Sequence, residues 1–217
     1  TTYSDGVEYE YRNKVEYSFW FDTDTERLSL AFFRRGSHGK IAVESTSLAS
    51  PAITTVSQQI LEVLNTQKIG GRDLKTLLIR SNRAGDTAWQ LYVKDDAFDP
   101  APLASALGEL AQSGEIIYSN PKSPASVITK RLYSGGAIVL KDSILDVPFR
   151  YATEGFFQIN LPVYEQTLRD MGEWVPDRIP VVDMYSGVGT IGLTIGGDDV
   201  TLVEVNEHAV REMERNI

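Results

Sequence analysis

The sequence contains no cysteine and only two histidines, His38 and His208, among its 217 residues. The absence of cysteine excludes disulfides, thiolate metal sites and cysteine nucleophiles within this chain. The two histidines lie far apart in the sequence, and no spacing typical of metal ligands is present. The sequence therefore predicts neither a metal site nor covalent catalysis by a thiol.

Long hydrophobic runs and an excess of positive charge are also missing. No apolar run approaches the roughly 20 residues of a membrane-spanning helix, and residues 1–10 are polar and acidic rather than a leader segment. The sequence thus predicts a cytoplasmic protein without a membrane partner. The net charge is −9, and residues 141–217 carry −8 of it, with 6 Lys+Arg against 14 Asp+Glu. A general basic surface for nucleic acid is absent, so contacts with RNA would need local basic groups.

The most informative stretch is a glycine-rich turn between two expected strands. An apolar run over 179–182 ends at Asp183, Gly187 and Gly189 follow, and a second strand over 200–205 carries Glu204 near its end. A strand, a glycine turn, a helix and a strand ending in an acid are typical of sites for a nucleotide-like cofactor. We interpret the turn as Gly-x-Gly without a third glycine. It also lacks the Lys-Ser/Thr of a phosphate loop, which favours S-adenosylmethionine over a cofactor with a pyrophosphate. The alternative is a βα turn of an unrelated α/β fold.

The remainder of the chain predicts two domains. The region 1–150 reads as an α+β central domain rich in antiparallel strands, and 151–217 as the first part of an α/β Rossmann-like domain. Alternation of apolar and polar residues over 11–21 predicts a half-buried strand, and Ser50-Pro51 predicts the start of a helix. The other expected strands are 28–34, 41–43, 74–80, 89–93, 116–118, 127–133 and 137–140, and the other expected helices are 102–112, 162–171 and 206–217.

Three stretches together resemble a known family. They are Tyr11–Ser18 (YRNKVEYS), Gly155–Asn160 (GFFQIN) and Asp183–Leu193 (DMYSGVGTIGL), followed by Glu204. In order and spacing they are similar to the RNA C5-uridine methyltransferases, S-adenosylmethionine-dependent enzymes that make 5-methyluridine in tRNA and rRNA. The resemblance runs from about Tyr11 to Ile217 and implies RNA as the partner and S-adenosylmethionine as the cofactor.

The resemblance also implies roles for individual residues, each with a structural alternative. Gln158 is expected to contact the cofactor, or else to cap a neighbouring element. Tyr185 is expected to line the cofactor pocket, or else to be a core aromatic residue. Glu204 is expected to accept hydrogen bonds from the ribose hydroxyls, or else to be a solvated acid. Backbone access at Gly187 and Gly189, a further contact at Thr190, and Asp183 complete the expected site. Asp183 could equally serve only the backbone amides of the turn.

Two departures from the family limit what the resemblance implies. The family uses a cysteine nucleophile and a carboxylate base that lie downstream of the Glu204 position, whereas this chain has no cysteine and ends at Ile217. We therefore expect no catalytic residue here and an inactive fragment of a larger enzyme. The fragment could arise by truncation, by proteolysis or from a shortened gene. An iron–sulfur cluster is not expected, since serine stands at Ser45 where the family often has its fourth cysteine.

Two further expectations concern partners. Arg12 and Lys14 could contact RNA phosphates, or could simply form the exposed face of a strand. Self-association through an incomplete sheet is also expected. The alternative function is a non-catalytic module that binds RNA or protein and keeps a vestigial cofactor site.

Overall fold

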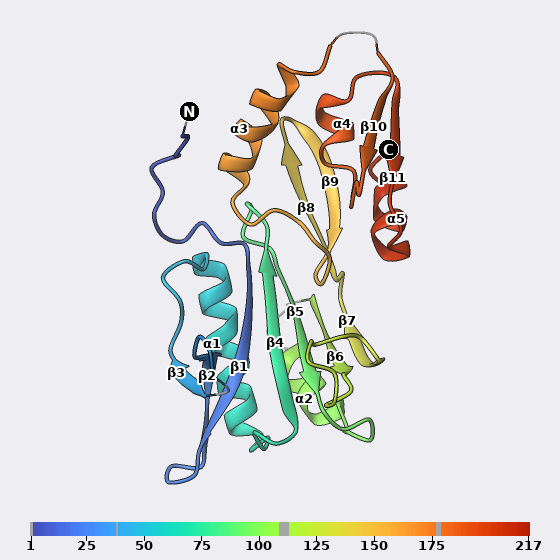
Figure 1. Cartoon of the computed structure of the whole chain (residues 1–217). Helices are drawn as coiled ribbons and strands as arrows, with labels where there is room; N and C mark the ends of the chain where they lie inside the picture. Colours follow the sequence, from blue (N-terminus) through green and yellow to red (C-terminus); the bar gives the residue numbers. More distant parts are fainter. Residues whose placement is uncertain (1, 38, 109–112, 177–178) are drawn as a thin grey trace.

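The computed structural model describes residues 2–37, 39–108, 113–176 and 179–217. The chain forms two parts, one above the other in Figure 1. The lower part holds a large sheet with two helices, and the upper part holds the C-terminal elements. His38 and residues 109–112 of the expected helix 102–112 fall outside the described residues.

The lower part is built on a seven-stranded sheet. The strand order is β3-β2-β1-β4-β5-β6-β7, and every neighbouring pair is antiparallel except β5 and β6. The strands are β1 (Lys14–Asp22), β2 (Arg27–Phe33), β3 (Lys40–Val43), β4 (Leu74–Ser81), β5 (Thr87–Val93), β6 (Ser113–Tyr118) and β7 (Lys130–Gly135). This confirms the antiparallel-rich character expected from the sequence.

Alternating residues of β1 explain how the sheet forms its core. Val15, Tyr17 and Phe19 are buried on one face, while Glu16 and Trp20 are exposed. Their buried face packs beneath α1 (Pro51–Thr66), whose apolar residues recur at helical spacing. The Ser50 side chain accepts a hydrogen bond from the Ile53 amide at the start of this helix, as the sequence predicts. A second helix, α2 (Ala101–Gly108), lies beside α1 and adds Leu103 and Leu107 to the same core.

Three local expectations were wrong. Gly114 was expected to end the helix over 102–112, but it does not. It lies inside β6, where a Cβ would meet the Trp89 ring at 2.0 Å, so only glycine fits beneath that indole. Val127 lies before β7 rather than within a strand. The antiparallel hairpin β8 (Val139–Ile144) and β9 (Val147–Ala152) extends well beyond the short strand expected at 137–140.

The upper part has its own core. The helix α3 (Leu161–Gly172) begins after Asn160, whose side chain caps it, close to the expected start. The strands β10 (Val181–Met184) and β11 (Val200–Val203) are parallel, and α4 (Gly192–Ile195) and α5 (Glu207–Met213) complete the described elements. The buried cluster of this part is formed by Leu140, Ile144, Phe149, Tyr151, Phe157, Leu161, Leu168 and Val188, together with Ala88 of β5.

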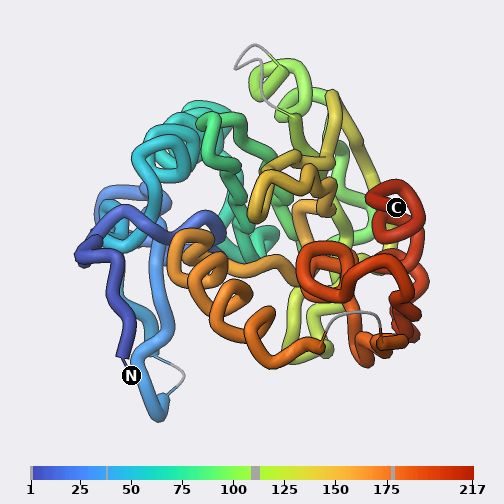
Figure 2. The backbone as a smooth tube through the Cα atoms, turned by 90° about the horizontal axis from the view of Figure 1, so that it is seen from above, coloured from blue at the N-terminus to red at the C-terminus, as the bar shows by residue number. Residues whose placement is uncertain are grey.

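The hairpin β8–β9 belongs to the upper part, where it lies beside α3 (Figure 1). Its residues Leu140 and Phe149 belong to the upper core, and the Tyr151 ring stacks on Phe157 at 3.8 Å between ring centroids. Seen from above, α3 and the C-terminal elements lie over one side of the large sheet (Figure 2). The division of the chain at residue 150 stays a prediction.

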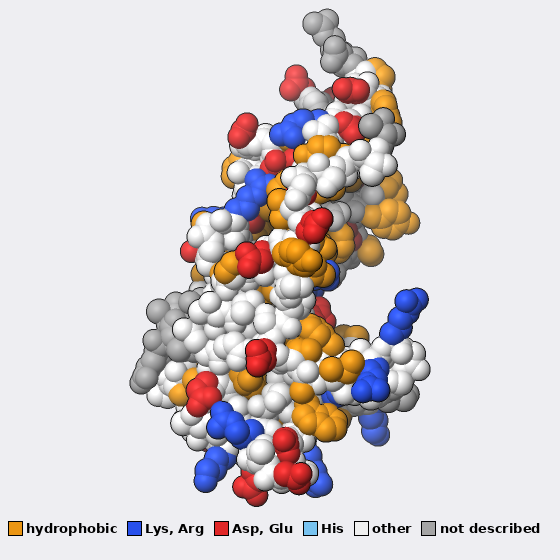
Figure 3. All heavy atoms as spheres, turned by 90° about the vertical axis from the view of Figure 1, so that its left-hand side faces the viewer, with side chains coloured by type: hydrophobic (Ala, Val, Ile, Leu, Met, Phe, Trp, Pro, Cys, Tyr) orange, Lys and Arg blue, Asp and Glu red, His pale blue; other side chains and the backbone are white. Residues whose placement is uncertain are grey.

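The face shown in Figure 3 agrees with the lack of a general basic surface expected from the sequence. Acidic and basic side chains are interspersed on the face shown in Figure 3, and no continuous basic area covers it. Among the described helices, none combines the length and the apolar character needed to cross a membrane.

Candidate functional site

The glycine-rich turn lies where two parallel strands end side by side. Met184 of β10 pairs with Val203 of β11, and the Ser186 amide donates to the Val203 carbonyl at 3.1 Å. Tyr185 begins the turn with φ +62, a backbone conformation that residues other than glycine and asparagine rarely adopt. The carboxyl ends of neighbouring parallel strands are where open α/β folds place their ligands.

Three glycines shape this turn, and the third corrects the sequence interpretation. Gly187 has φ +57, and a Cβ added there meets nothing within 4 Å, so its outer side is open. Gly189 has φ +91 and packs against Leu193. Gly192 completes a Gly-x-Gly-x-x-Gly spacing, and a Cβ there would lie 2.3 Å from Leu202 Cδ2. The turn therefore has the third glycine, needed for close packing of helix on strand, and its glycine spacing does not argue against a pyrophosphate.

Glu204 follows β11 directly and faces the turn. Its Oε2 accepts from the Gly187 amide at 2.9 Å, and its Oε1 accepts from the Val205 and Asn206 amides at 2.7 and 2.8 Å. The Asn206 amide has the largest effect on the pKa of Glu204. Together with the Gly187 and Val205 amides it holds this pKa below its ordinary value, although burial acts in the opposite direction. A carboxylate accepts about four hydrogen bonds, so Glu204 can take one more donor in this arrangement.

Asp183 and Thr190 serve the structure of the turn in this conformation. The buried Asp183 Oδ2 accepts from the Gly192 amide at 2.9 Å, which is the structural alternative foreseen for this residue. The Thr190 hydroxyl lies 2.8 Å from the Tyr164 hydroxyl of α3. These contacts fix the turn against its neighbouring strand and helix.

A cavity of about 490 Å³ lies between the two parts, in front of the turn. Gly187, Val188 and Glu204 line one side of it, and Tyr92 of β5 with Ile128 lines the other. Glu154 and Phe156, from the segment after β9, form a wall. Of the expected site residues, this cavity brings together Gly187 and Glu204.

Gln158 lines a different, larger cavity of about 840 Å³. Its backbone carbonyl accepts from Asn13 Nδ2 at 2.8 Å, which ties the segment 154–159 to the start of β1. Tyr185 is 84% exposed rather than a core residue, and it lines neither cavity. Gln158 and Tyr185 therefore do not line the cavity that Glu204 lines, although Tyr185 follows the strand that pairs with the one before Glu204.

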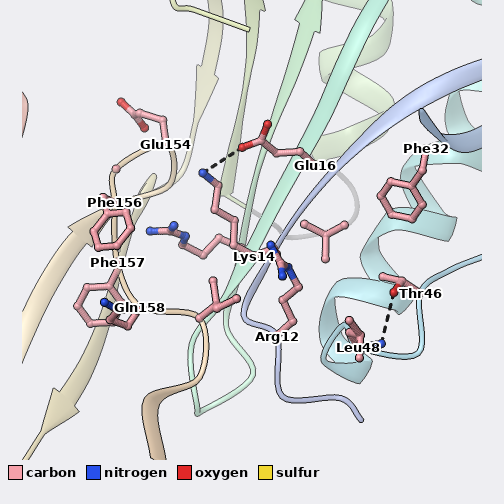
Figure 4. Close-up of a pocket in the computed structure, with 14 residues that line it drawn as sticks. Arg12, Lys14, Glu16, Phe32, Thr46, Leu48, Glu154, Phe156, Phe157 and Gln158 are labelled. Atoms are coloured by element: carbon pink, nitrogen blue, oxygen red, sulfur yellow. Dashed lines mark hydrogen bonds and ion pairs between the residues drawn. The ribbon is translucent and has the colours of Figure 1, made fainter. Parts of the chain in front are cut away.

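The large cavity combines cations from the lower part with an aromatic wall. Arg12, just before β1, and Lys14, its first residue, line this cavity together with Phe156 and Phe157 (Figure 4). Lys14 Nζ forms an ion pair with Glu16 at 3.1 Å. Arg80, near the end of β4, also lines this cavity. Its charged lining residues are Arg12, Lys14 and Arg80 against Glu16 and Glu154, a balance of +1 in a chain of net charge −9.

Glu154, Gly155 and Phe156 line both cavities, so this short segment is their common wall. Glu154 is held by Arg131 Nη2 at 3.3 Å and by Gln90 Nε2 at 2.9 Å. The same two side chains hold Glu115, which is 0% exposed, at 2.6 and 2.7 Å. Phe156 itself is 78% exposed. A buried polar network of the sheet thus fixes the wall between the cavities.

The sequence did not single out Arg80, Glu115 or Phe156 as individual functional residues. Arg80 was read only as the last residue of the expected strand 74–80, and Glu115 lay just before the expected strand 116–118. A charged residue next to or within an apolar strand is nevertheless a signal, because buried charges require partners. Phe156 appeared in the family motif, but its exposed position between two cavities had no local signal.

No protein-family model matches the chain. Curated relatives are proteins named as uncharacterized RNA methyltransferases. That of Fusobacterium nucleatum is 28% identical over 225 residues, covering 95% of this chain and 48% of the relative. That of Lactobacillus johnsonii is 26% identical, covering 88% and 46%, and that of Enterococcus faecalis is 25% identical, covering 96% and 49%. The chain therefore spans about half the length of the curated relatives it matches.

One solved structure matches the fold along nearly the whole chain. It is the Pyrococcus abyssi tRNA (uracil-54, C5)-methyltransferase in complex with S-adenosyl-L-homocysteine, with a TM-score of 0.80 and 19% identity, covering 97% of this chain and 52% of that protein. In sequence the chain is similar to proteins named RNA methyltransferases, in fold it matches half of a tRNA (uracil-54, C5)-methyltransferase, and these two findings support its resemblance to the RNA 5-methyluridine methyltransferase family.

Proposed function

We propose that this chain forms the cofactor-binding and RNA-binding part of an S-adenosylmethionine-dependent RNA methyltransferase that makes 5-methyluridine in tRNA or rRNA. The observation that carries the proposal is the position of Glu204 beside the open face of Gly187. Both lie at the ends of parallel strands and line one cavity between the two parts. The names of the sequence relatives and the fold match support the choice of reaction and substrate.

The residues present fit S-adenosylmethionine, whose role when bound is to supply the methyl group. Glu204 has one acceptor site left for a ribose hydroxyl, and turning Oε1 away from the Val205 and Asn206 amides would free it for the second. The open face of Gly187 leaves space for close approach of a ligand. Asp183, Gly189 and Thr190 support this arrangement by fixing the turn. Direct contacts from Gln158 and Tyr185 require the segment 154–159 and the turn to approach each other.

The RNA substrate would enter from the side of the large cavity. A base that is modified inside a folded RNA must leave its stack to reach a cofactor. Phe156 is exposed and borders both cavities, so a flipped uridine could stack on it while facing the cofactor cavity. The cytoplasmic location and the self-association expected from the sequence remain part of this proposal.

This chain by itself is expected not to transfer methyl groups. It contains no cysteine, whereas the family's chemistry, as implied by the resemblance, begins with a cysteine attack on the uracil ring. The residues described here would bind and orient cofactor and RNA. One observation favours the second candidate, a binding module with a vestigial site: three backbone amides already occupy most of the acceptor sites of the Glu204 carboxylate.

Calorimetric titration with S-adenosyl-L-homocysteine tests the proposal. The unmodified chain should bind it, and Glu204→Gln should weaken binding by roughly ten-fold or more, because a charged acceptor for a hydroxyl is worth about 1.5–3 kcal/mol. Glu207→Gln is the control, since it removes the same charge from an exposed side chain on α5 that forms an ion pair with Arg211. No detectable binding by the unmodified chain would favour the vestigial module, and equal affinities of the two variants would remove Glu204 from the site.

A further inference from the structure

Arg80 is the most unusual charged residue in the described part of the chain. It is 1% exposed, yet no carboxylate lies within ion-pair distance of it among the described residues. Its Nη1 donates to the Ala152 carbonyl at 3.2 Å, its guanidinium lies 5.4 Å from the Tyr151 ring centroid, and its Nε has no hydrogen-bond partner. A guanidinium has five N–H groups to donate, so most of them are unused.

Burial of an unpaired cation is costly, and such groups in folded proteins need an explanation. Burial lowers the pKa of Arg80 to about 10, with opposing effects of Tyr151, Glu154 and Glu16, so the side chain keeps its charge at neutral pH. The Ala152 carbonyl does not depend on Arg80, because it also accepts from the Gly155 amide at 3.2 Å. The Ala152 carbonyl would therefore keep a hydrogen-bond donor even without the Arg80 guanidinium.

The surroundings of Arg80 point to an anionic ligand. Arg80 lines the large cavity together with Arg12, whose Nε donates to the Lys14 carbonyl and which has no carboxylate partner among the described residues. The carboxylates of the cavity are already paired, Glu16 with Lys14 and Glu154 with Arg131. Two guanidinium groups thus remain uncompensated in one cavity of about 840 Å³, a volume within the usual range of ligand sites.

We propose that Arg80 and Arg12 hold a backbone phosphate of the RNA in the large cavity, next to the nucleotide that reaches the cofactor cavity. This inference rests on the proposed function for the identity of the polymer. Guanidinium groups match the geometry of phosphate oxygens and bind them through two parallel N–H bonds. The segment Glu154–Phe156 separates the two cavities, so a phosphate bound at Arg80 would lie in the cavity adjacent to the one that the glycine turn lines.

Fluorescence anisotropy with a labelled single-stranded oligouridylate of about ten nucleotides tests the proposal. Arg80→Met and Arg12→Met should each lower affinity by roughly ten-fold or more, and each should reduce the slope of log affinity against log salt by about one. The matched control is Arg27→Met, which removes the same charge from an exposed pair with Glu62 at the start of β2, outside the cavity. It should change affinity by less than about two-fold, because exposed pairs away from a site contribute little.

Thermal unfolding separates phosphate binding from a purely structural role. Arg80→Met should unfold at an unchanged or higher temperature, because methionine fills the space and no protein acceptor is left unpaired. If Arg80→Met fails to fold, Arg12→Met decides alone, since Arg12 is only half-buried.

The proposal is overturned if both cavity variants bind the oligouridylate as well as the unmodified chain does, or if the loss equals that of Arg27→Met. It is also overturned if inorganic phosphate binds at Arg80 but does not compete with the oligouridylate, since the site would then serve a free anion. Loss of S-adenosyl-L-homocysteine binding would leave the RNA result standing and would count against the proposed function alone.

Discussion

Removal of Arg131 should destabilise the chain far more than removal of another arginine of the same sheet. Glu115 is 0% exposed and accepts from Arg131 Nε at 2.6 Å, from Gln90 Nε2 at 2.7 Å and from the Ser134 hydroxyl at 2.9 Å. The change Arg131→Met leaves this carboxylate buried without a counter-ion. Loss of one partner of a buried pair costs about 3–5 kcal/mol.

The structure places the expected cost near the lower end of that range. Gln90 and Ser134 continue to donate to Glu115 in the variant, and Arg131 itself is 36% exposed. We therefore expect a loss of about 3 kcal/mol in the free energy of unfolding. Arg27→Met is the comparison, because Arg27 and Glu62 form a pair at 3.0 Å whose side chains are 59% and 67% exposed. Its cost should be about 0–1 kcal/mol.

Urea unfolding of four proteins measures the effect, namely the unmodified chain, Arg131→Met, Glu115→Gln and the double variant. Because Glu115→Gln removes the buried charge, the double variant should be more stable than Arg131→Met, with a coupling of at least about 1 kcal/mol. If Arg131→Met costs no more than Arg27→Met, or if the double variant shows the sum of the two single effects, the pairing of Glu115 with Arg131 does not stabilise the sheet.

Two other changes test the turn. Gly192→Ala should destabilise the chain by about 1–3 kcal/mol, because its Cβ would lie 2.3 Å from Leu202 Cδ2. Gly108→Ala, where a Cβ meets nothing within 4 Å, should leave the melting temperature unchanged. Backbone amides lower the pKa of Glu204, so its charged form stabilises the fold above the ordinary glutamate pKa of about 4.3, and this contribution disappears as the pH falls through the folded-state value. Glu204→Gln should therefore make the free energy of unfolding fall less steeply as the pH is lowered, which urea unfolding at a series of pH values measures.

Elements with strong local signals were predictable from the sequence. The alternation in β1 gave the correct buried face, and Ser50-Pro51 marked the start of α1. The order strand, glycine turn, strand and acid over 181–204 was also correct. Closely spaced glycines after an apolar strand indicate a turn with positive φ, and Gly187 and Gly189 have such angles. In these segments the residues that determine the structure lie within a few positions of each other, as at a helix start, or the apolar residues recur with a fixed period.

The hairpin β8–β9 had no such signal, for a conformational reason. Its two-residue turn is Leu145-Asp146, and both residues have positive φ, at 50 and 66. Turns of this kind usually carry Asn-Gly or Asp-Gly, and leucine in this conformation is a poor predictor of a turn. The hairpin is stable because Ile144, Phe149 and Tyr151 are buried in the upper core, an effect of tertiary packing.

The candidate site was only partly predictable, because its sequence motifs lie in two cavities. Gln158 and Glu204 belong to one family pattern, yet Gln158 lines the large cavity and Glu204 the smaller one. Their separation depends on the segment after β9, which is fixed by the stacking of Phe157 on Tyr151 and by the bonds from Arg131 and Gln90 to Glu154. The spacing of these residues in the sequence does not indicate that they contact each other.

We expect the same wall to couple the two cavities if both bind ligands. Glu154 and Phe156 contact both spaces, so a ligand that shifts Phe156 on one side changes the shape available on the other. Coupling between sites is reciprocal in free energy: if RNA at Arg80 strengthens binding of S-adenosyl-L-homocysteine, the cofactor must strengthen binding of RNA by the same factor. The factor can be measured in two independent ways, by titrating the chain with RNA in the presence of S-adenosyl-L-homocysteine and with S-adenosyl-L-homocysteine in the presence of RNA. Arg131→Met should reduce it by loosening Glu154, and equal coupling in the variant and in the unmodified chain would show that the wall does not transmit it.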